Sequence, residues 1–192
     1  MERSKLITQL SLKNGFILAL ISIVISLLMH FVDPMLAYKS SMLMLSLMIV
    51  YIGLMVYAGI TIRKEIGGYW TFGEAFKAFL IISLVICISS TLYNVVLMGI
   101  VDPTLAERGG ELIDAKTREF MLGVGMSEEQ VEQEMAKAGS GADRLEVNFK
   151  NTVTSFGVVL ALYGVISLIL AAILKKNPPV RLEMDEYEKG TV

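Results

Sequence analysis

Long apolar blocks alternate with short charged segments along the chain. Four blocks, residues 14–32, 40–62, 78–101 and 152–174, contain no Asp, Glu, Lys or Arg. A helix of about 20 apolar residues crosses the hydrocarbon layer of a bilayer, and these blocks have 19 to 24 residues. Helices of a soluble bundle usually keep a polar stripe, which the blocks lack. The pattern predicts four transmembrane helices, over about 14–32, 40–62, 76–101 and 152–174.

The spacing of the blocks predicts an all-α integral membrane protein with one membrane domain over residues 1–192. The first three spans are joined by short connections. About 50 residues, 102–151, separate the third span from the fourth. We expect this segment to be a partly helical insertion outside the membrane, and residues 175–192 to be a short tail.

The distribution of basic residues predicts the orientation of the four spans. Lys and Arg in short loops favour the cytoplasmic side, whereas long loops carry little weight. The short turn between the first two spans has only Lys39. We therefore expect both termini to be cytoplasmic and residues 102–151 to be periplasmic, in a bacterial inner membrane. The residues that set this orientation are Arg3, Lys5, Lys13, Arg63, Lys64, Lys77, Lys175 and Lys176.

A hexapeptide occurs twice, as VDPMLA at Val32–Ala37 and as VDPTLA at Val101–Ala106. Each copy follows an apolar block. Proline cannot continue a helix and moves the preceding residue out of the helical region. Asp33-Pro34 and Asp102-Pro103 are therefore predicted to cap helices where they leave the membrane.

The hexapeptide has two explanations that the sequence leaves open. The chain could be a parallel repeat of two helical hairpins, an arrangement found in transporters, with the insertion added to the second hairpin. Alternatively, two membrane exits converged on the same cap.

The connection between the second and third spans reads GGYWTFGEAFKAF, from Gly67 to Phe79. The glycine pair is typical of a helix C-terminus. Thr71 and Glu74 form the pattern of a capping box, and Glu74 has the spacing to pair with Lys77. The aromatic residues suit the membrane interface. Structural roles account for the whole motif, and a docking surface for a partner is the alternative. The residues of the motif are Gly67, Gly68, Trp70, Thr71, Phe72, Gly73, Glu74, Phe76 and Lys77.

The same motif carries a family resemblance. A Gly-Gly-aromatic-x-x-Phe-Gly-x-Ala-Phe-Lys connection between two spans, followed by Asp-Pro after the third, resembles a family of four-span membrane proteins of Bacteroidota. The family is catalogued as domain of unknown function four-one-nine-nine. The resemblance extends from about Lys13 to Lys176 and implies a bacterial inner-membrane location. It implies no activity and assigns no functional residue.

The insertion is polar but contains helix signals. Ser127 and Gln130 form a second capping box, and Met126 with Val131 has the spacing of a hydrophobic staple. Gly139 is expected to end the resulting helix, and residues 112–122 are predicted as another. Eleven acidic and six basic residues give the segment a net charge of −5. We expect a helical cap on the membrane, with a periplasmic contact surface as the alternative, and we find no Ca²⁺-binding spacing.

The fourth span carries a stripe of small residues at spacings of three and four. Small residues let helices approach closely in lipid. We expect the stripe to pack against another helix, either within the bundle or in a homodimer: Gly157, Ala161, Gly164, Ser167 and Ala171.

Polar chemistry inside the spans is sparse. Ionisable residues within spans usually mark transport paths, and the four blocks have no Asp, Glu, Lys or Arg. Asn94, beside Tyr93, is the most polar deep residue, and it either bonds a neighbouring helix or contacts a substrate. A transporter would need a polar midplane cavity lined by Asn94, Tyr57 or Ser89. His30, the only histidine, is expected at the interface.

Methionines at positions 44, 48 and 55 share one face of the second span. Thioether sulfur suits Cu(I), but methionine is also an ordinary packing residue. The sequence does not decide between the two, and we predict no metal, cofactor or catalytic residue.

These patterns favour a structural or interaction protein over an enzyme. The chain has one His and one Cys, which leaves no candidates for a nucleophilic triad, and it has no phosphate-binding loop. We expect an accessory membrane subunit that contacts the lipid bilayer and a homo-oligomeric or membrane-protein partner. A small oligomeric transporter or channel component is the alternative. The net charge of −2 argues against nucleic acid.

Overall fold

Four helices long and apolar enough to span a membrane form the body of the protein. The structure, a computed structural model, describes residues 2–177. The spans are α1 (Glu2–Val32), α3 (Ser41–Glu65), α4 (Phe72–Val96) with its π-helical continuation η1 (Leu97–Val101), and α8 (Phe149–Leu174). The prediction of an all-α chain with four spans is confirmed for these residues. The chain is therefore a multi-pass membrane protein, and most of the predicted tail, 178–192, lies outside the described residues.

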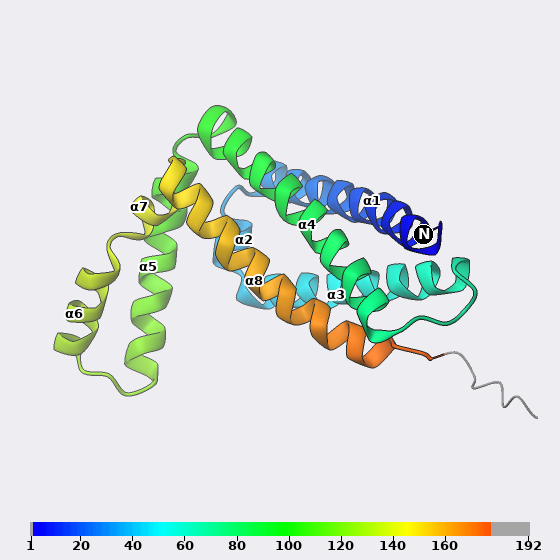
Figure 1. The fold of residues 1–192 in the computed structure, drawn as a ribbon. Coiled ribbons are helices and arrows are strands. Elements are labelled where there is room, and N and C mark those ends of the chain that lie inside the picture. The colour runs from blue at the N-terminus through cyan, green and yellow to red at the C-terminus, as the bar shows by residue number, and fades with distance from the viewer. Residues whose placement is uncertain (1, 178–192) are drawn as a thin grey trace, which may run out of the picture.

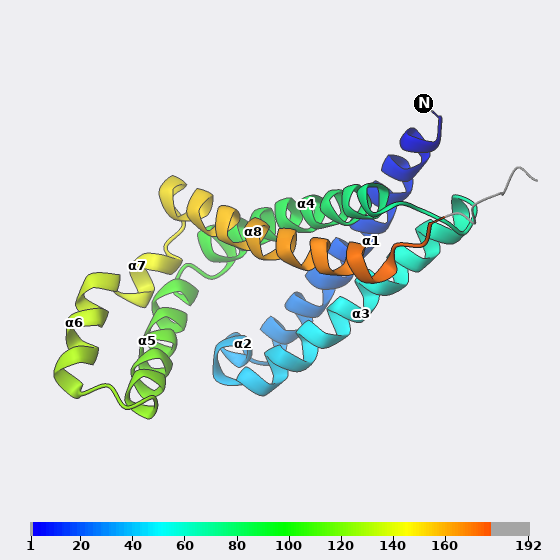
Figure 2. The ribbon, with the colours of Figure 1, turned by 60° about the horizontal axis from the view of Figure 1, so that its bottom comes forward.

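The bundle has two distinct ends. We call the end that holds Glu2, the loop at residues 66–71 and Lys176 the basal end. The opposite end, which we call the arm end, holds Asp33, Asp102 and four shorter helices. Three of them form an arm that extends away from the spans (Figures 1 and 2). The four shorter helices are α2 (Leu36–Lys39), α5 (Leu105–Gly123), α6 (Glu128–Ala138) and α7 (Gly141–Leu145). The arm consists of α5, α6 and α7.

Helix α4 lies at the centre and packs against both α1 and α8. Helix α1 buries one stripe, which begins at Ile7 and reaches Ala19, and that stripe faces α4. At Gly15 a Cβ atom would lie 3.0 Å from the Val85 Cβ and 3.3 Å from the Ile82 Cα. Glycine therefore lets the two helices approach closely, as small residues do in membrane bundles. Helix α1 begins at Glu2, whereas the predicted first span begins at about residue 14.

Helix α3 joins the core only through its basal half. Its buried residues are Met55, Ala58, Gly59 and Ile62, spaced as one helical face. A Cβ atom at Gly59 would lie 2.4 Å from the Phe79 Cζ, so the Phe79 ring occupies the space that a side chain would need. From Ser41 to Val50 every residue of α3 is exposed or half-buried. Figure 2 shows α3 and α8 diverging toward the arm end.

Both copies of the hexapeptide fold into the same local structure. Asp33 Oδ2 accepts a hydrogen bond from Lys39 Nζ at 2.7 Å, and Asp102 Oδ2 accepts one from Arg108 at 2.6 Å. In each copy the cation lies six residues after the aspartate, and the aspartate carbonyl accepts the amide of the leucine three residues on. The predicted helix ends after Val32 and Val101 are present. Shared ancestry and convergence would both produce this geometry, so duplication stays a prediction.

One helix of the insertion has its predicted extent and the other is longer than predicted. The Ser127–Gln130 capping box is formed and α6 ends before Gly139, whose φ is +73°. Helix α5 begins seven residues before the predicted position 112. Gly109 and Gly110 lie inside this helix, where the absence of a side chain lets Tyr38 and the Ala142 backbone approach closely. A Cβ at Gly109 would lie 3.0 Å from the Tyr38 ring.

Candidate functional site

A cavity of about 280 Å³ with a mixed polar and apolar lining lies at the arm end, between α4 and α8. The last residues of α7 and the segment after it cover the cavity, and Tyr38 of α2 forms one side. Its volume is at the small end of the range for ligand sites. The lining residues are Tyr38, Ser90, Thr91, Asn94, Val95, Met98, Arg144, Leu145, Glu146, Val147, Asn151, Thr152, Ser155, Phe156 and Val159.

Polar side chains of the two spans converge on this cavity without partners of their own. Asn94 comes from α4, one turn after Ser90, and Thr152 and Ser155 come from the first two turns of α8. Within residues 2–177, the side chains of Asn94, Thr152 and Ser155 make no hydrogen bond to the protein, whereas Ser90 Oγ donates to the Cys87 carbonyl. Asn94 and Ser155 are exposed and Thr152 is half-buried, so their polar groups are open to whatever occupies the cavity. Water or a ligand in the cavity would supply these bonds.

The cover of the cavity is held in place by close backbone contact between α5 and α7. A Cβ atom at Gly110 would lie 2.1 Å from the Ala142 nitrogen, and one at Gly141 would lie 2.3 Å from the Gly110 oxygen. Asp114 of α5 accepts hydrogen bonds from the Gly141 amide at 2.7 Å and from Arg144 at 2.6 Å. These contacts fix α7, and with it the residues from Arg144 to Val147 that line the cavity.

Asn151 secures the segment between α7 and α8. Its side-chain nitrogen donates to the carbonyls of Asp143 and Glu146, the second at 3.1 Å. Its backbone amide donates to the side chain of Asn148, which caps α8. One asparagine therefore stabilises both the start of the span and the cover above it.

The charges around the cavity are largely compensated. Arg144 is paired with Asp114 at 2.6 Å, and both side chains are partly exposed. Glu146 is the other charged residue of the lining. Burial raises the pKa of the Tyr38 hydroxyl, which stays neutral and able to donate at physiological pH. Among residues 2–177, the lining therefore presents hydroxyl and amide groups together with one ion-paired arginine and one glutamate.

The bundle is closed beneath the cavity. Cys87 is fully buried and lies 3.7 Å from the Phe156 carbonyl oxygen. Further toward the basal end, Ser83 and Ser167 are buried and hydrogen-bonded across α4 and α8 at 3.1 Å. Among the residues that the structure describes, the cavity belongs to the arm half and does not continue through the midplane.

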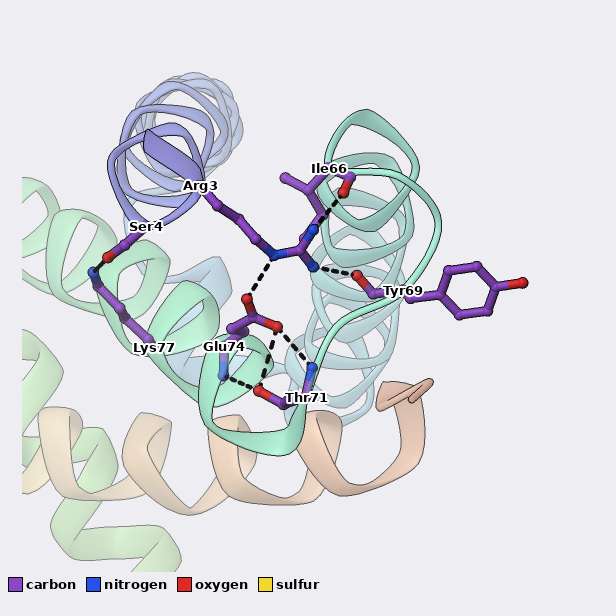
Figure 3. Close-up of polar contacts among 7 residues, drawn as sticks. All are labelled: Arg3, Ser4, Ile66, Tyr69, Thr71, Glu74 and Lys77. Carbon is purple, nitrogen blue, oxygen red and sulfur yellow. Dashed lines mark hydrogen bonds and ion pairs between the residues drawn. The ribbon is translucent and has the colours of Figure 1, made fainter. Parts of the chain in front are cut away.

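A second polar assembly, at the basal end, ties α1 to the connection between α3 and α4 (Figure 3). Arg3 donates to Glu74 Oε1 at 2.7 Å, to the Ile66 carbonyl at 2.7 Å and to the Tyr69 carbonyl at 2.6 Å. The planar guanidinium suits this use because its donors lie in a fixed fork. Glu74 also completes the predicted capping box with Thr71. The expected Glu74–Lys77 pair is not formed, since Arg3 takes the carboxylate and Lys77 donates to Ser4.

The same connection is bonded to the end of α8. Trp70 and Lys176 exchange two backbone hydrogen bonds, at 2.9 and 3.1 Å. The Trp70 indole and the Arg63 guanidinium both donate to the Leu174 carbonyl, one of the carbonyls that a helix end leaves unpaired. We call Arg3, Trp70, Glu74 and Lys176, with the loop that they hold, the basal clasp. It accounts for the loop motif in structural terms.

The other predicted site residues lie apart. Ser167 and Ala171 are buried, whereas Gly157 and Ala161 are exposed, so packing of the second pair stays a prediction. Tyr93 borders the arm-end cluster of Met35, Leu97 and Leu105, and its hydroxyl is buried without a partner in the described residues. Met44, Met48 and Tyr57 are exposed. Met55 lies in the core, and Ser89 and His30 lie outside the cavity lining.

The sequence did not indicate several residues of these sites. The sequence pattern identifies Arg3 only as an orientation signal, and Asp114 and Arg144 only as charges of a polar loop. Their partners are 27 to 71 positions away, so no local pattern connects them. A signal was available for Ser155 and Thr152, since they are polar and lie near one end of an apolar span. Among residues 2–177 no group of three His, Cys, Asp or Glu side chains is placed to hold a metal ion.

Comparison with known proteins gives a family but no activity. No curated protein and no solved structure matches the chain. The family model described as Protein of unknown function (DUF4199) matches residues 13–176. Because this match spans most of the 192 residues and includes both hexapeptides and the loop motif, the chain belongs to the DUF4199 family.

Proposed function

We propose that the protein is a non-catalytic accessory subunit of the bacterial inner membrane, which binds a transmembrane partner through the arm half of α8. In this proposal the basal end is cytoplasmic. The basic residues of the basal end support that orientation, because they fall in short segments beside the spans. The absence of enzyme motifs from the sequence supports a role in binding.

The uncovered small residues of α8 carry the proposal. Gly157 and Ala161 are exposed, and a Cβ atom at Gly157 or at Gly164 would meet nothing within 4 Å. Apolar exposure by itself is ordinary for a span in lipid, but lipid contact gives no reason for small residues. Small residues at spacings of three and four are what a closely approaching helix requires. The same stripe is buried at Ser167 and Ala171, where Ser167 is bonded to Ser83 of α4, and it is open from Gly157 to Ala161.

The test is a pull-down from native membranes with a tag on the C-terminus. In the double variant Gly157→Leu/Ala161→Leu, two bulky side chains would block close approach, and we expect a stoichiometric partner to be lost. The matched control is Val158→Leu/Val165→Leu, which enlarges exposed residues on a neighbouring face of the same helix. Recovery of a homo-oligomer without other proteins, or of the same partner from the Gly157 variant, would contradict the proposal.

The cavity favours a second candidate, a small transporter or channel component. Asn94 lines the cavity, as a transporter would require, although Tyr57 and Ser89 do not. A transporter needs the cavity to communicate with the midplane, where Cys87 is buried. A water-soluble thiol reagent tests this, because Cys87 is the only cysteine. Labelling of native Cys87 at a rate like that of Asn94→Cys in a Cys87→Ser background would favour transport, and protection of Cys87 would favour the accessory role.

A further inference from the structure

We propose that the arm is an interfacial anchor, in which Phe120 and Val124 at its tip insert into the arm-end leaflet of the bilayer that holds the spans. This surface is separate from the small-residue face of α8 and goes beyond the accessory role. For the helical cap that the sequence predicts, it names the side chains that enter the lipid. The argument rests on the level at which α5 is held, on the face of α5 that carries Phe120 and on the charge of the arm.

Contacts with the first residue of α3 hold α5 at the level where the spans leave the membrane. Lys116 Nζ donates to the Lys39 carbonyl at 2.9 Å and to Ser41 Oγ at 3.2 Å. Ser41 begins α3, and the uncharged block of that span begins at Ser40. Met42, the next residue, is 82% exposed, as expected for a side chain that faces lipid. The middle of α5 therefore lies at the membrane interface.

Phe120 lies on the face of α5 that is turned toward α2 and the start of α3. Gly109, Lys116 and Phe120 are spaced by seven and four residues, which places them on one helical face. Gly109 lies against the Tyr38 ring of α2, and Lys116 is bonded at the start of α3. Phe120 is 69% exposed, and Val124, four residues on, is 61% exposed. Figures 1 and 2 show this end of α5 clear of the four spans, so the face that contacts them continues over the membrane surface.

The other two helices of the arm pack on a different face of α5. Gly110 and Asp114 contact α7, and Arg118 lies 3.8 Å from Glu132 of α6. Positions 110, 114 and 118 are four residues apart and share one side of the helix. In the part of the chain that the structure describes, α6 and α7 therefore leave the Phe120 face uncovered.

Lipid suits this tip better than a protein partner does. The Phe120 face continues the lipid-facing surface that begins at Met42 of α3, so the bilayer is its neighbour. A protein would have to displace that lipid to reach the ring. An interfacial helix usually lies about 5–10 Å into the boundary between head groups and acyl chains, and this depth would bury both tip side chains.

The charge of the arm indicates which kind of lipid surface it meets. Leaflets rich in anionic lipid attract basic segments, but the insertion has a net charge of −5. Near the tip, Lys116 is bonded to protein and Arg118 lies beside Glu132. Insertion is therefore driven by burial of apolar side chains, and zwitterionic lipid is sufficient. The exposed acidic residues of α6 are Glu128, Glu129, Glu132 and Glu134.

The test measures the depth of the tip in the full chain, reconstituted as one copy per nanodisc of phosphatidylethanolamine and phosphatidylcholine. An environment-sensitive fluorophore is attached to Phe120→Cys in a Cys87→Ser background. We expect blue-shifted emission, strong quenching by lipids that carry a nitroxide near the head group, and loss of quenching by iodide. Ala115→Cys is the matched control, because Ala115 is exposed on another face of the same helix, and its probe should show the reverse.

A second measurement needs no label and keeps the proposal testable if the cysteine variants fold poorly. Hydrogen exchange of Phe120→Glu/Val124→Glu is compared with that of Ala115→Glu in the same nanodiscs. Loss of the anchor should accelerate exchange in the last turn of α5 and in α6, and the control should not.

Four results would overturn the proposal. Equal iodide quenching at the two labelled positions would place the tip in water, and equal exchange in the two glutamate variants would show that the tip restrains nothing. A blue shift that requires phosphatidylglycerol would indicate attraction to anionic head groups. A blue shift that requires two copies in one nanodisc would indicate contact between chains.

Discussion

The basal half of the bundle is filled with interlocking side chains, whereas the arm half is open, although the same four helices build both. At the basal end Trp70, Phe79, Met55 and Ile62 are fully buried, and the basal clasp bonds the ends of all four spans together. At the arm end α3 leaves the bundle, and polar side chains of α4 and α8 surround a cavity. Within one membrane domain, one end is closely packed and the other is open, and it is at the open end that we propose binding.

The physical origin of this difference is the pattern of glycines and aromatic residues. Gly59 makes room for Phe79, and Phe79 meets the Trp70 ring edge to face at 5.9 Å. At the arm end the glycines serve the arm, because Gly110 and Gly141 let α5 and α7 touch. Among the spans, glycines allow close packing at Gly59, which faces an aromatic ring, and at Gly15, which faces Val85 and Ile82.

The largest effect is expected from Trp70→Ala, which would break the packed half. Removing this buried ring and its indole hydrogen bond should lower the free energy of unfolding by about 3–5 kcal/mol. Circular dichroism during detergent-induced unfolding measures the change. Phe72→Ala is the control, since the Phe72 side chain is 41% exposed. An equal loss in both variants would contradict the assignment of Trp70 to the core.

The arm half can be disturbed separately through Gly110→Ala. The new methyl group would overlap the Ala142 backbone, and overpacking of this kind costs about 1–3 kcal/mol. We expect faster hydrogen exchange in α7 and the following segment, with no change at the basal clasp. Gly123→Ala, where a Cβ meets nothing within 4 Å, should leave exchange in α7 unaltered. Faster exchange throughout the bundle would show that the two halves are coupled.

A smaller effect is expected from Arg3→Ala, which removes three hydrogen bonds from the basal clasp. The Arg3 side chain is 47% exposed, so solvent screening limits the loss to about 1 kcal/mol. Hydrogen exchange at residues 66–71 should accelerate, whereas Lys5→Ala should leave it unchanged. Unaltered exchange in the Arg3 variant would mean that Trp70 and Lys176 alone hold the loop.

The smallest effect concerns the two aspartate caps of the arm end. The Lys39 ammonium, followed by the Met35 amide, lowers the pKa of Asp33, and the Thr104 hydroxyl and Arg108 lower the pKa of Asp102. A lowered pKa contributes stability above the unfolded pKa, and this stability is lost as pH falls through the folded value. Thermal stability should therefore decline slightly below about pH 4. Asp33→Asn/Asp102→Asn should reduce that dependence, and an unchanged pH profile would contradict the role of the caps.

Local patterns in the sequence predicted the local structure well. The four spans, both capping boxes and the glycine stop at Gly67 and Gly68, whose φ values are +103° and +85°, are present. Each depends on residues within a few positions of one another, which is where propensity and capping act.

Contacts between distant residues could not be predicted in the same way. Nothing near Arg3 indicates that Glu74 will be its partner, and nothing near Asp114 indicates Arg144. The cavity lies where α4 and α8 meet Tyr38 of α2 and the segment after α7, which depends on contacts between residues far apart in the sequence. Asn94 was identified as a candidate because a polar residue in an apolar span is unusual, but its surroundings come from four separate helices and the segment after α7.

The backbone bridge between Trp70 and Lys176 has a mechanical consequence. Both of its hydrogen bonds, together with the bond from the Trp70 indole to the Leu174 carbonyl, join the end of α8 to the start of α4. A pulling force applied at the C-terminal side would first load these three bonds in parallel and would reach the unwinding of α8 only after they ruptured. Single-molecule extension from that side should therefore begin with one discrete rupture event, before the helix is extracted from the bilayer.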